Sequence, residues 1–165
     1  MKTNRSNFLC GFMGAGKSSI LKEIDTKENI TCMDLDLHIE NLYGPINKIF
    51  DDKGESFFRL TEQEEFFEQV DRFDLIALGG GAVENDEIYK HILQSDKAIY
   101  LEIDFNTLWE RIKNSNRPLV KLGKESVRNL FDKRIEKYQS LKHTVSFSSE
   151  ENLYRAVLNA VELKK

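Results

Sequence analysis

The sequence predicts an α/β fold in which helices cover both faces of a parallel sheet. Short apolar runs alternate with longer stretches of helical periodicity along the 165 residues, which is the order expected of β-α-β units. A glycine-rich turn follows the first apolar run, and polar residues follow later ones, at the strand ends where such sheets bind ligands. The length and the 40% hydrophobic content suit one domain, residues 1–165, with one core.

Five short apolar runs, bounded by glycine or polar residues, are the predicted strands. The first of them ends at Gly11, and the third runs into three consecutive glycines. The strands are predicted at residues 6–10, 30–33, 75–78, 98–101 and 145–147.

The stretches between these runs are predicted to be helices. One helix, at residues 38–43, stops at Gly44-Pro45, a pair that breaks helices. Another follows Asp104, which can cap it. The last helix gathers Leu153, Val157 and Val161 on one face, together with two alanines. Further helices are predicted at residues 17–27, 56–71 and 125–142.

Composition excludes several classes of protein. A net charge of −4 gives no basic footprint for a nucleic acid. No apolar run approaches the roughly 20 residues that span a bilayer, and the N-terminal stretch lacks the apolar segment of a signal peptide. Cys10 and Cys32 fall in predicted strands without a CxxC or Cys/His cluster, so we expect reduced core thiols. We therefore expect a cytoplasmic monomer with no nucleic-acid or membrane partner.

The stretch GFMGAGKS, residues 11–18, matches the phosphate-loop pattern G-x-x-x-x-G-K-[ST]. In this pattern the backbone N–H groups of a glycine-rich turn hold phosphate oxygens, Lys17 reaches the β- and γ-phosphates, and the Ser18 hydroxyl holds Mg²⁺. The N-terminus of the next helix adds positive potential. The residues predicted to hold the triphosphate are Gly14, Ala15, Gly16, Lys17, Ser18 and Ser19.

This loop alone leaves open whether the phosphate is hydrolysed or transferred. A GTPase should carry a base-reading Asn-Lys-x-Asp, but the nearest stretch, residues 47–50, reads NKIF and lacks the aspartate. A motor or transporter ATPase would normally need a longer chain. A small-molecule kinase is the remaining class.

Two carboxylates follow the second predicted strand. Asp34 and Asp36 are two residues apart, and in an extended segment such residues point to the same side. One carboxylate can hold the water shell of Mg²⁺, and the other can bind an acceptor hydroxyl and take its proton. The alternative is a solvated acidic turn, and the neighbouring phosphate loop disfavours it.

Three further features suit a small acidic acceptor. Arg59 lies among phenylalanines one turn before Glu62, so it can be preorganised to receive a carboxylate. The run Gly79–Gly81 allows something to approach the backbone closely. Arg117 lies in a polar loop that could close over the triphosphate, and Arg134 lies on a charged helix. Each also has a plainer reading as a surface ion pair, a flexible turn or a solvated face.

Taken together, these motifs resemble the shikimate kinase family. They occur in order along nearly the whole chain: GFMGAGKS, DLDxxIE from Asp34, IFDDKGExxFRxxE from Ile49, LGGGAV from Leu78, RPL from Arg117 and RxxxY from Arg134. The resemblance implies a P-loop kinase fold with a five-stranded parallel sheet, an acceptor-binding region at about 34–62 and a lid at about 113–124. It also implies phosphorylation of the 3-hydroxyl of shikimate by ATP with Mg²⁺, in chorismate and aromatic amino-acid biosynthesis.

The resemblance also implies a role for each matching residue. Asp36, Lys17 and Arg117 would be catalytic. Ser18 and Asp34 would hold the metal, and Arg111 would face the adenine while Arg117 reaches the phosphates. The shikimate contacts would be Asp36, Arg59, Gly80, Gly81 and Arg134.

Three alternatives stay open. The chain could be another P-loop kinase, gluconate-kinase-like or dephospho-coenzyme-A-kinase-like, although the arginine and glycine set suits a small carboxylic acid better than a coenzyme. It could be a nucleotide-binding regulator or an inactive homologue, but no catalytic position is visibly lost. The chain departs from the family's usual pattern at residues 140–145, and the adenine-slot residues near 146–150 are left unassigned.

Overall fold

The computed structural model describes residues 5–147 and 150–162. Its centre is a five-stranded, wholly parallel sheet with strand order β2-β3-β1-β4-β5, so the predicted fold class is confirmed. Because the chain crosses from β3 over β1 to β4, the carboxyl end of β1 is the switch point where such sheets bind ligands. The strands are β1 Asn7–Cys10, β2 Cys32–Asp34, β3 Leu75–Ala77, β4 Ala98–Glu102 and β5 His143–Ser146.

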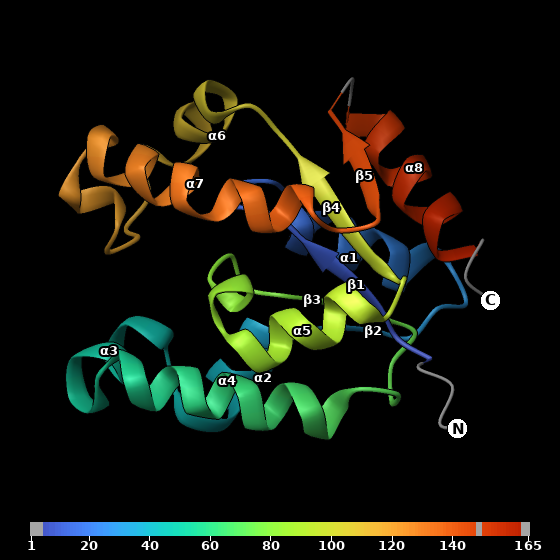
Figure 1. Cartoon of the computed structure of the whole chain (residues 1–165), viewed down its shortest axis with the longest axis horizontal. Coiled ribbons are helices and arrows are strands. Elements are labelled where there is room, and N and C mark those ends of the chain that lie inside the picture. Colours follow the sequence, from blue (N-terminus) through green and yellow to red (C-terminus); the bar gives the residue numbers. More distant parts are fainter. Residues whose placement is uncertain (1–4, 148–149, 163–165) are drawn as a thin grey trace.

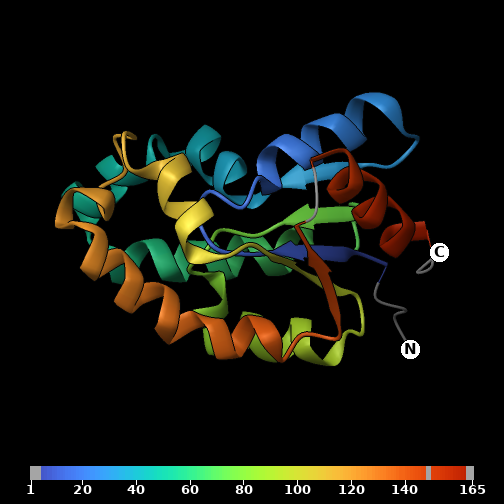
Figure 2. The same ribbon diagram turned by 90° about the horizontal axis from the view of Figure 1, so that it is seen from above.

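Helices cover both faces of this sheet. Figure 2 shows α1 and α8 on one side of the strands and α5 and α7 on the other. Helices α2, α3 and α4 pack on one another and lie below the sheet in Figure 1. The helices are α1 Lys17–Lys27, α2 Leu35–Tyr43, α3 Ile46–Lys53, α4 Glu55–Gln69, α5 Asp86–Gln94, α6 Phe105–Ile112, α7 Lys124–Gln139 and α8 Glu150–Glu162, with single 3-10 turns η1 Ala82–Glu84 and η2 Val120–Leu122.

Burial on both faces explains why the strands are continuous apolar runs. All of β1 and β3 is buried, and Phe8, Leu9, Leu75 and Ile76 are fully inaccessible. Between β4 and α7 the rings of Tyr100 and Tyr138 stack, with centroids 5.1 Å apart. This stack fixes α7 against the sheet and so positions the residues that α7 carries. Among the described residues, no helix is long and apolar enough to cross a membrane.

Several element boundaries differ from the prediction. Strand β2 begins at Cys32 rather than Ile30, since its register against β3 begins with Cys32 opposite Leu75. Just before it, the backbone N–H and hydroxyl of Thr31 both donate to Asp74 Oδ2, at 2.9 and 2.8 Å. Strand β5 covers 143–146 rather than 145–147, since its register against β4 begins at His143. Cys32, expected in the core, is only partly buried.

Sequence reasoning missed helix α5. Asn85 Oδ1 accepts hydrogen bonds from the N–H groups of Glu87 and Ile88, each at 3.1 Å, and so caps the helix. Ile88 and Ile92, one turn apart, are its buried residues. Both signals are present in the sequence, but the segment is only nine residues long and its apolar pattern is correspondingly short.

Candidate active site

The phosphate loop connects β1 to α1 at the switch point of the sheet. Gly14 and Gly16 have φ of +81° and +95°, in the left-handed region that favours glycine. At Gly14 a Cβ would also lie 2.6 Å from Cγ2 of Ile112. Arg111 supports the loop from α6, where its Nη1 donates to Gly14 O at 3.0 Å. The turn therefore needs glycine both for its backbone conformation and for its packing on α6.

Lys17 lies at the start of α1 and folds back over the loop. Its ammonium donates to the carbonyls of Gly11 and Phe12, at 2.6 and 3.1 Å. Burial lowers the pKa of Lys17 to about 8, against the opposing attraction of Asp36, and the positive charge of Arg117 also lowers this pKa. Arg117 is exposed and precedes η2, yet it acts on Lys17 from within electrostatic range. The charges of the two cations predicted at the triphosphate therefore interact.

Ser18 and Asp34 form a pair of oxygen ligands beside Lys17. The Ser18 hydroxyl donates to Asp34 Oδ2 at 2.6 Å, and Asp34 Oδ1 accepts from the N–H of Leu37 at 3.2 Å. Oxygen ligands of this kind fit Mg²⁺, which usually keeps several waters and binds one or two protein oxygens together with substrate phosphates. Within the described ranges no group of three or more acidic, histidine or cysteine side chains could hold a metal.

Asp36 does not lie in an extended segment, so the reason given for pairing it with Asp34 was wrong. Asp34 ends β2 and caps α2, and Asp36 belongs to the first turn of that helix. Its carboxylate nevertheless reaches the glycine run: a Cβ at Gly79 would lie 2.5 Å from Asp36 Oδ1. The same oxygen is buried and has no hydrogen-bond partner in the part of the chain that the structure describes. Burial and the charge of Asp34 raise the pKa of Asp36 to about 6, while Lys17 and Arg59 oppose the shift.

Arg59 extends from α4 toward the end of the same glycine run. Its Nη1 donates to Glu62 Oε2 at 2.8 Å, as the i+3 spacing predicted, and its Nη2 donates to Glu55 Oε1 at 3.5 Å. The Glu62 side chain is fully buried, and burial raises its pKa to about 7 against the attraction of Arg59. A Cβ at Gly81 would lie 2.3 Å from Arg59 Nη2. The guanidinium therefore needs the space that glycine leaves.

Arg134 approaches the glycine run from α7, on the opposite side. Its side chain is only 5% exposed, and its Nε and Nη2 both contact Glu84 Oε2, at 2.8 and 2.6 Å. Its Nη1 points toward the backbone, 3.7 Å from the position of a Cβ at Gly80. One helical turn later, the Tyr138 hydroxyl donates to the carbonyl of Gly80, so both side chains of the RxxxY motif lie beside the same glycine.

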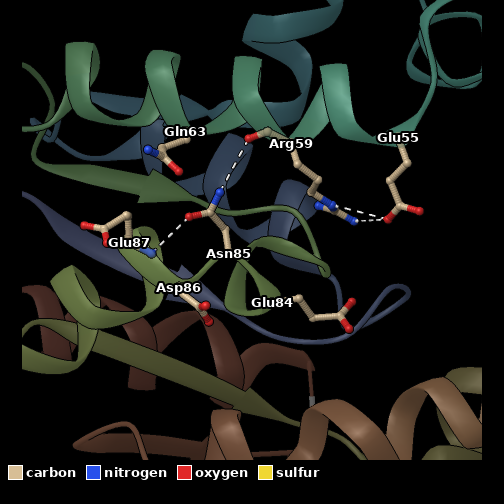
Figure 3. Close-up of a pocket in the computed structure, with 7 residues that line it drawn as sticks. All are labelled: Glu55, Arg59, Gln63, Glu84, Asn85, Asp86 and Glu87. Carbon is tan, nitrogen blue, oxygen red and sulfur yellow. Dashed lines mark hydrogen bonds and ion pairs between the residues drawn. The ribbon is translucent and has the colours of Figure 1, made fainter.

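Figure 3 shows a cavity between α4 and the segment that leads into α5. Its volume is about 430 Å³. Arg59 and Glu55 project into it from α4, and Glu84 lies across from them. The lining residues are Glu55, Arg59, Gln63, Glu84, Asn85, Asp86 and Glu87. The cavity thus adjoins Arg59 and the Glu84 partner of Arg134, and its lining is rich in carboxylates.

The remaining predicted nucleotide contacts lie beside the loop. Ala15 is buried, and Ser19 is exposed in the first turn of α1. The Arg111 guanidinium lies over the ring of Phe147, 5.3 Å from its centroid. The residues near 146–150 that sequence reasoning left unassigned fall partly outside the described residues, because 148 and 149 are not among them.

Comparison with known proteins identifies the family. The sequence model of the shikimate kinase family matches residues 13–163, which is most of the chain. The chain belongs to the shikimate kinase family. A shikimate kinase of Dictyoglomus turgidum is 40% identical over 137 residues, covering 79% of this chain and 80% of that protein. A bifunctional shikimate kinase/3-dehydroquinate synthase of Thermotoga maritima is 34% identical over 161 residues, covering 96% of this chain, and the chain spans 33% of that protein's length.

A solved member of the shikimate kinase family has the same architecture. Shikimate kinase from Acinetobacter baumannii in complex with shikimate is 26% identical to this chain, with a TM-score of 0.85 over 99% of this chain and 96% of that one. Together with the family match, this makes the gluconate-kinase-like and dephospho-coenzyme-A-kinase-like alternatives the less supported ones.

Sequence reasoning missed Glu84 and Glu55, which pair with the two arginines. Glu55 could have been found, because it lies four residues before Arg59 on the same helix. Glu84 had no signal, since it meets Arg134 across 50 residues of chain and belongs to no recognisable motif.

We expect the Asp36 carboxyl to titrate near pH 6 in the unliganded protein. Asp34→Asn removes a neighbouring negative charge and Arg59→Met removes a positive one, so the midpoint should fall in the first variant and rise in the second. A carbon-13 NMR titration of the Asp36 carboxyl measures both shifts, with the exposed Asp132→Asn as the matched control. A midpoint at the ordinary value of 3.8, unmoved by either change, would contradict this expectation.

Proposed function

We propose that this chain is a shikimate kinase that transfers the γ-phosphoryl group of ATP to the 3-hydroxyl of shikimate, giving shikimate 3-phosphate and ADP. The observation that carries the proposal is the glycine run beside the phosphate loop. A Cβ at Gly80 would lie 3.3 Å from the N atom of Met13. The neighbouring glycines touch Asp36 and Arg59. The proposed triphosphate site and the proposed acid-binding site therefore lie side by side, where the backbone at Gly80 approaches the backbone of the phosphate loop.

The donor half of the site handles the triphosphate. The loop N–H groups and Lys17 are suited to hold its oxygens, and Arg117 is suited to neutralise charge that develops on the transferring group. Ser18 and Asp34 would hold Mg²⁺, which supplies further charge neutralisation when bound. Closure of the segment around Arg117 would exclude water, so that the phosphoryl group passes to the acceptor rather than to water. Arg111 and Phe147 would flank the adenine.

The acceptor half of the site handles a small hydroxylated acid. Arg59 and Arg134 flank the glycine run and are suited to receive the carboxylate of shikimate. The unpartnered Oδ1 of Asp36 is suited to accept a hydrogen bond from the 3-hydroxyl. Above about pH 6 the carboxylate form of Asp36 prevails, so this group can orient the hydroxyl and take its proton as the phosphoryl group arrives. The A. baumannii relative, solved in complex with shikimate, supports the choice of acid.

The setting of the enzyme is part of the same proposal. We infer a cytoplasmic monomer composed of a single domain, with its acceptor-binding region at about 34–62 and its lid at about 113–124. The product would serve the synthesis of chorismate and the aromatic amino acids, as expected of this family.

The first test is the reaction itself. Purified protein with Mg²⁺ and ATP should release ADP only when shikimate is added, in a coupled assay that follows ADP. Gluconate and dephospho-coenzyme A serve as control acceptors, because they represent the alternative kinases. ADP release that does not depend on shikimate would overturn the proposal.

Asp36→Asn should lower turnover at least about 100-fold, the usual scale for losing a positioned base. The amide keeps the size of the side chain, so the affinity for ATP should change less than about twofold. Steady-state rates and ATP binding by calorimetry measure the two effects, and Asp52→Asn on the exposed face of α3 is the matched control. Turnover near that of the wild type would remove Asp36 from the catalytic role.

Gly81→Ala should raise the KM for shikimate about tenfold, while the KM for ATP stays within about twofold. The added Cβ would lie 2.3 Å from Arg59 Nη2, so the guanidinium must move, and weakening one charge-assisted hydrogen bond costs about 1.5 kcal/mol. Gly81 has φ of −93°, outside the left-handed region, so the added methyl brings no backbone strain of that kind and its effect reports the contact with Arg59. The exposed Ser56→Ala on the same helix as Arg59 is the control. Equal changes in both KM values would count against the assignment of Arg59.

A further inference from the structure

Arg134 already holds a carboxylate in the structure. Its Nε and Nη2 both contact Oε2 of Glu84, and these two groups form an edge of the guanidinium that binds carboxylates in a bidentate manner. The other oxygen of Glu84, Oε1, lies 2.7 Å from the ammonium of Lys133. In this state Glu84 occupies the bidentate edge of Arg134, and an incoming acid meets only the remaining N–H groups of Nη1 and Nη2 unless Glu84 moves.

We propose that Glu84 is an internal competitor for the carboxylate of the acceptor, and that Lys133 retains Glu84 when the acceptor displaces it from Arg134. This inference rests on the proposed function, since it concerns the acid-binding site of that reaction. It assigns Glu84 and Lys133 a part in setting the affinity for the acid, without contact with the reacting atoms.

The burial of Arg134 explains why a competitor is needed. A guanidinium that is 5% exposed and lacks a counter-ion destabilises the fold, because removing one member of a buried pair leaves a buried charge unpaired. Glu84 supplies that counter-ion when no acid is bound. Burial alone would raise the pKa of Glu84, but its pairs with Lys133 and Arg134 outweigh burial and lower it, so Glu84 is ionised at neutral pH.

Exposure and geometry allow the exchange. The Glu84 side chain is 21% exposed, and that of Lys133 is 71% exposed, so the second partner of Glu84 extends into solvent. One oxygen of Glu84 makes both contacts with Arg134, while the other already binds Lys133. Rotation of Glu84 toward Lys133 therefore frees Arg134 without leaving the Glu84 carboxylate unpaired.

The affinity for the acid then depends on the difference in free energy between two ion pairs, that of Arg134 with the acceptor and that of Arg134 with Glu84. The acceptor gains its contact with Arg134 and loses the contact between Arg134 and Glu84. A ligand without a carboxylate cannot replace Glu84 as the ion-pair partner of Arg134. The product keeps the carboxylate of the substrate, so the same competition also favours its release.

The decisive variant is Glu84→Gln, compared with Glu87→Gln. Glu87 lines the same cavity and loses the same charge, but in the described part of the chain it forms no ion pair with Arg59 or Arg134. We expect Glu84→Gln to bind shikimate about 5 to 10 times more tightly, equivalent to about 1 to 1.4 kcal/mol, and Glu87→Gln to change binding less than twofold. Calorimetry with shikimate and no nucleotide measures the dissociation constant directly, and steady-state KM values provide a second reading.

Lys133 provides a second test, and its first step, the single Lys133→Met variant, does not depend on the folding of the Glu84 variant. Lys133→Met leaves Glu84 with Arg134 as its only partner among the described residues, so shikimate should bind about threefold more weakly. In the Glu84→Gln background the same lysine change should have no effect, which makes a double-mutant cycle. An equal loss in both backgrounds would show a general charge effect and overturn the proposal.

The outcomes separate this inference from the proposed function. Shikimate-dependent turnover by the wild type, combined with a Glu84→Gln variant that binds shikimate no better than Glu87→Gln does, would overturn the competitor alone. Weaker binding in Glu84→Gln would instead make Glu84 a residue that positions Arg134. A wild type that neither binds nor phosphorylates shikimate would overturn the proposed function, and this inference with it.

Discussion

The close approach of the backbone at Gly79–Gly81 is the constraint on which the rest of the site depends. At each of these three positions a side chain would meet a different part of the molecule: the Asp36 carboxylate, the phosphate loop beside Arg134, and the Arg59 guanidinium. Only glycine leaves room for all three contacts at once. The run follows β3, which is next to β1 in the sheet. The phosphate loop after β1 therefore lies close to the side chains that surround this run.

Charge balance is the second requirement of this site. Arg59 and Arg134 are largely buried, and each is matched by carboxylates: Glu62 and Glu55 for the first and Glu84 for the second. These carboxylates let the folded protein keep two guanidinium groups away from water before any substrate arrives. The raised pKa values of Asp36 and Glu62 are the electrostatic consequence of placing several acids in a small, poorly solvated space.

The fold and the position of the phosphate loop between β1 and α1 were readable from sequence because their signals are local. Apolar runs alternate with helical periods, and the phosphate loop is a continuous motif between a strand and a helix. The acceptor half was readable only in part. Asp36 was chosen for a geometric reason that was wrong. The carboxylate of Asp34 accepts a hydrogen bond from the N–H of Leu37 and caps α2, so Asp36 lies in a helix and not in an extended segment. No local sequence pattern shows that the last residue of a strand also caps the next helix. Glu84 was missed since its partner lies on a helix 50 residues away, and only the packing of α7 through the stack of Tyr100 and Tyr138 brings the two together.

The pair of Glu84 and Arg134 shows how a preorganised site can also be a reversible one. A buried arginine with no partner would bind an acid tightly, but it would destabilise the empty protein and retain the product. An arginine paired permanently with a buried acid would be stable but unavailable. Glu84 lies between these extremes, because it is ionised, partly exposed and shared with a lysine in solvent. The unliganded fold is then stabilised by the same contact that the acceptor has to replace, so stability without substrate and moderate affinity for the acid have one physical cause.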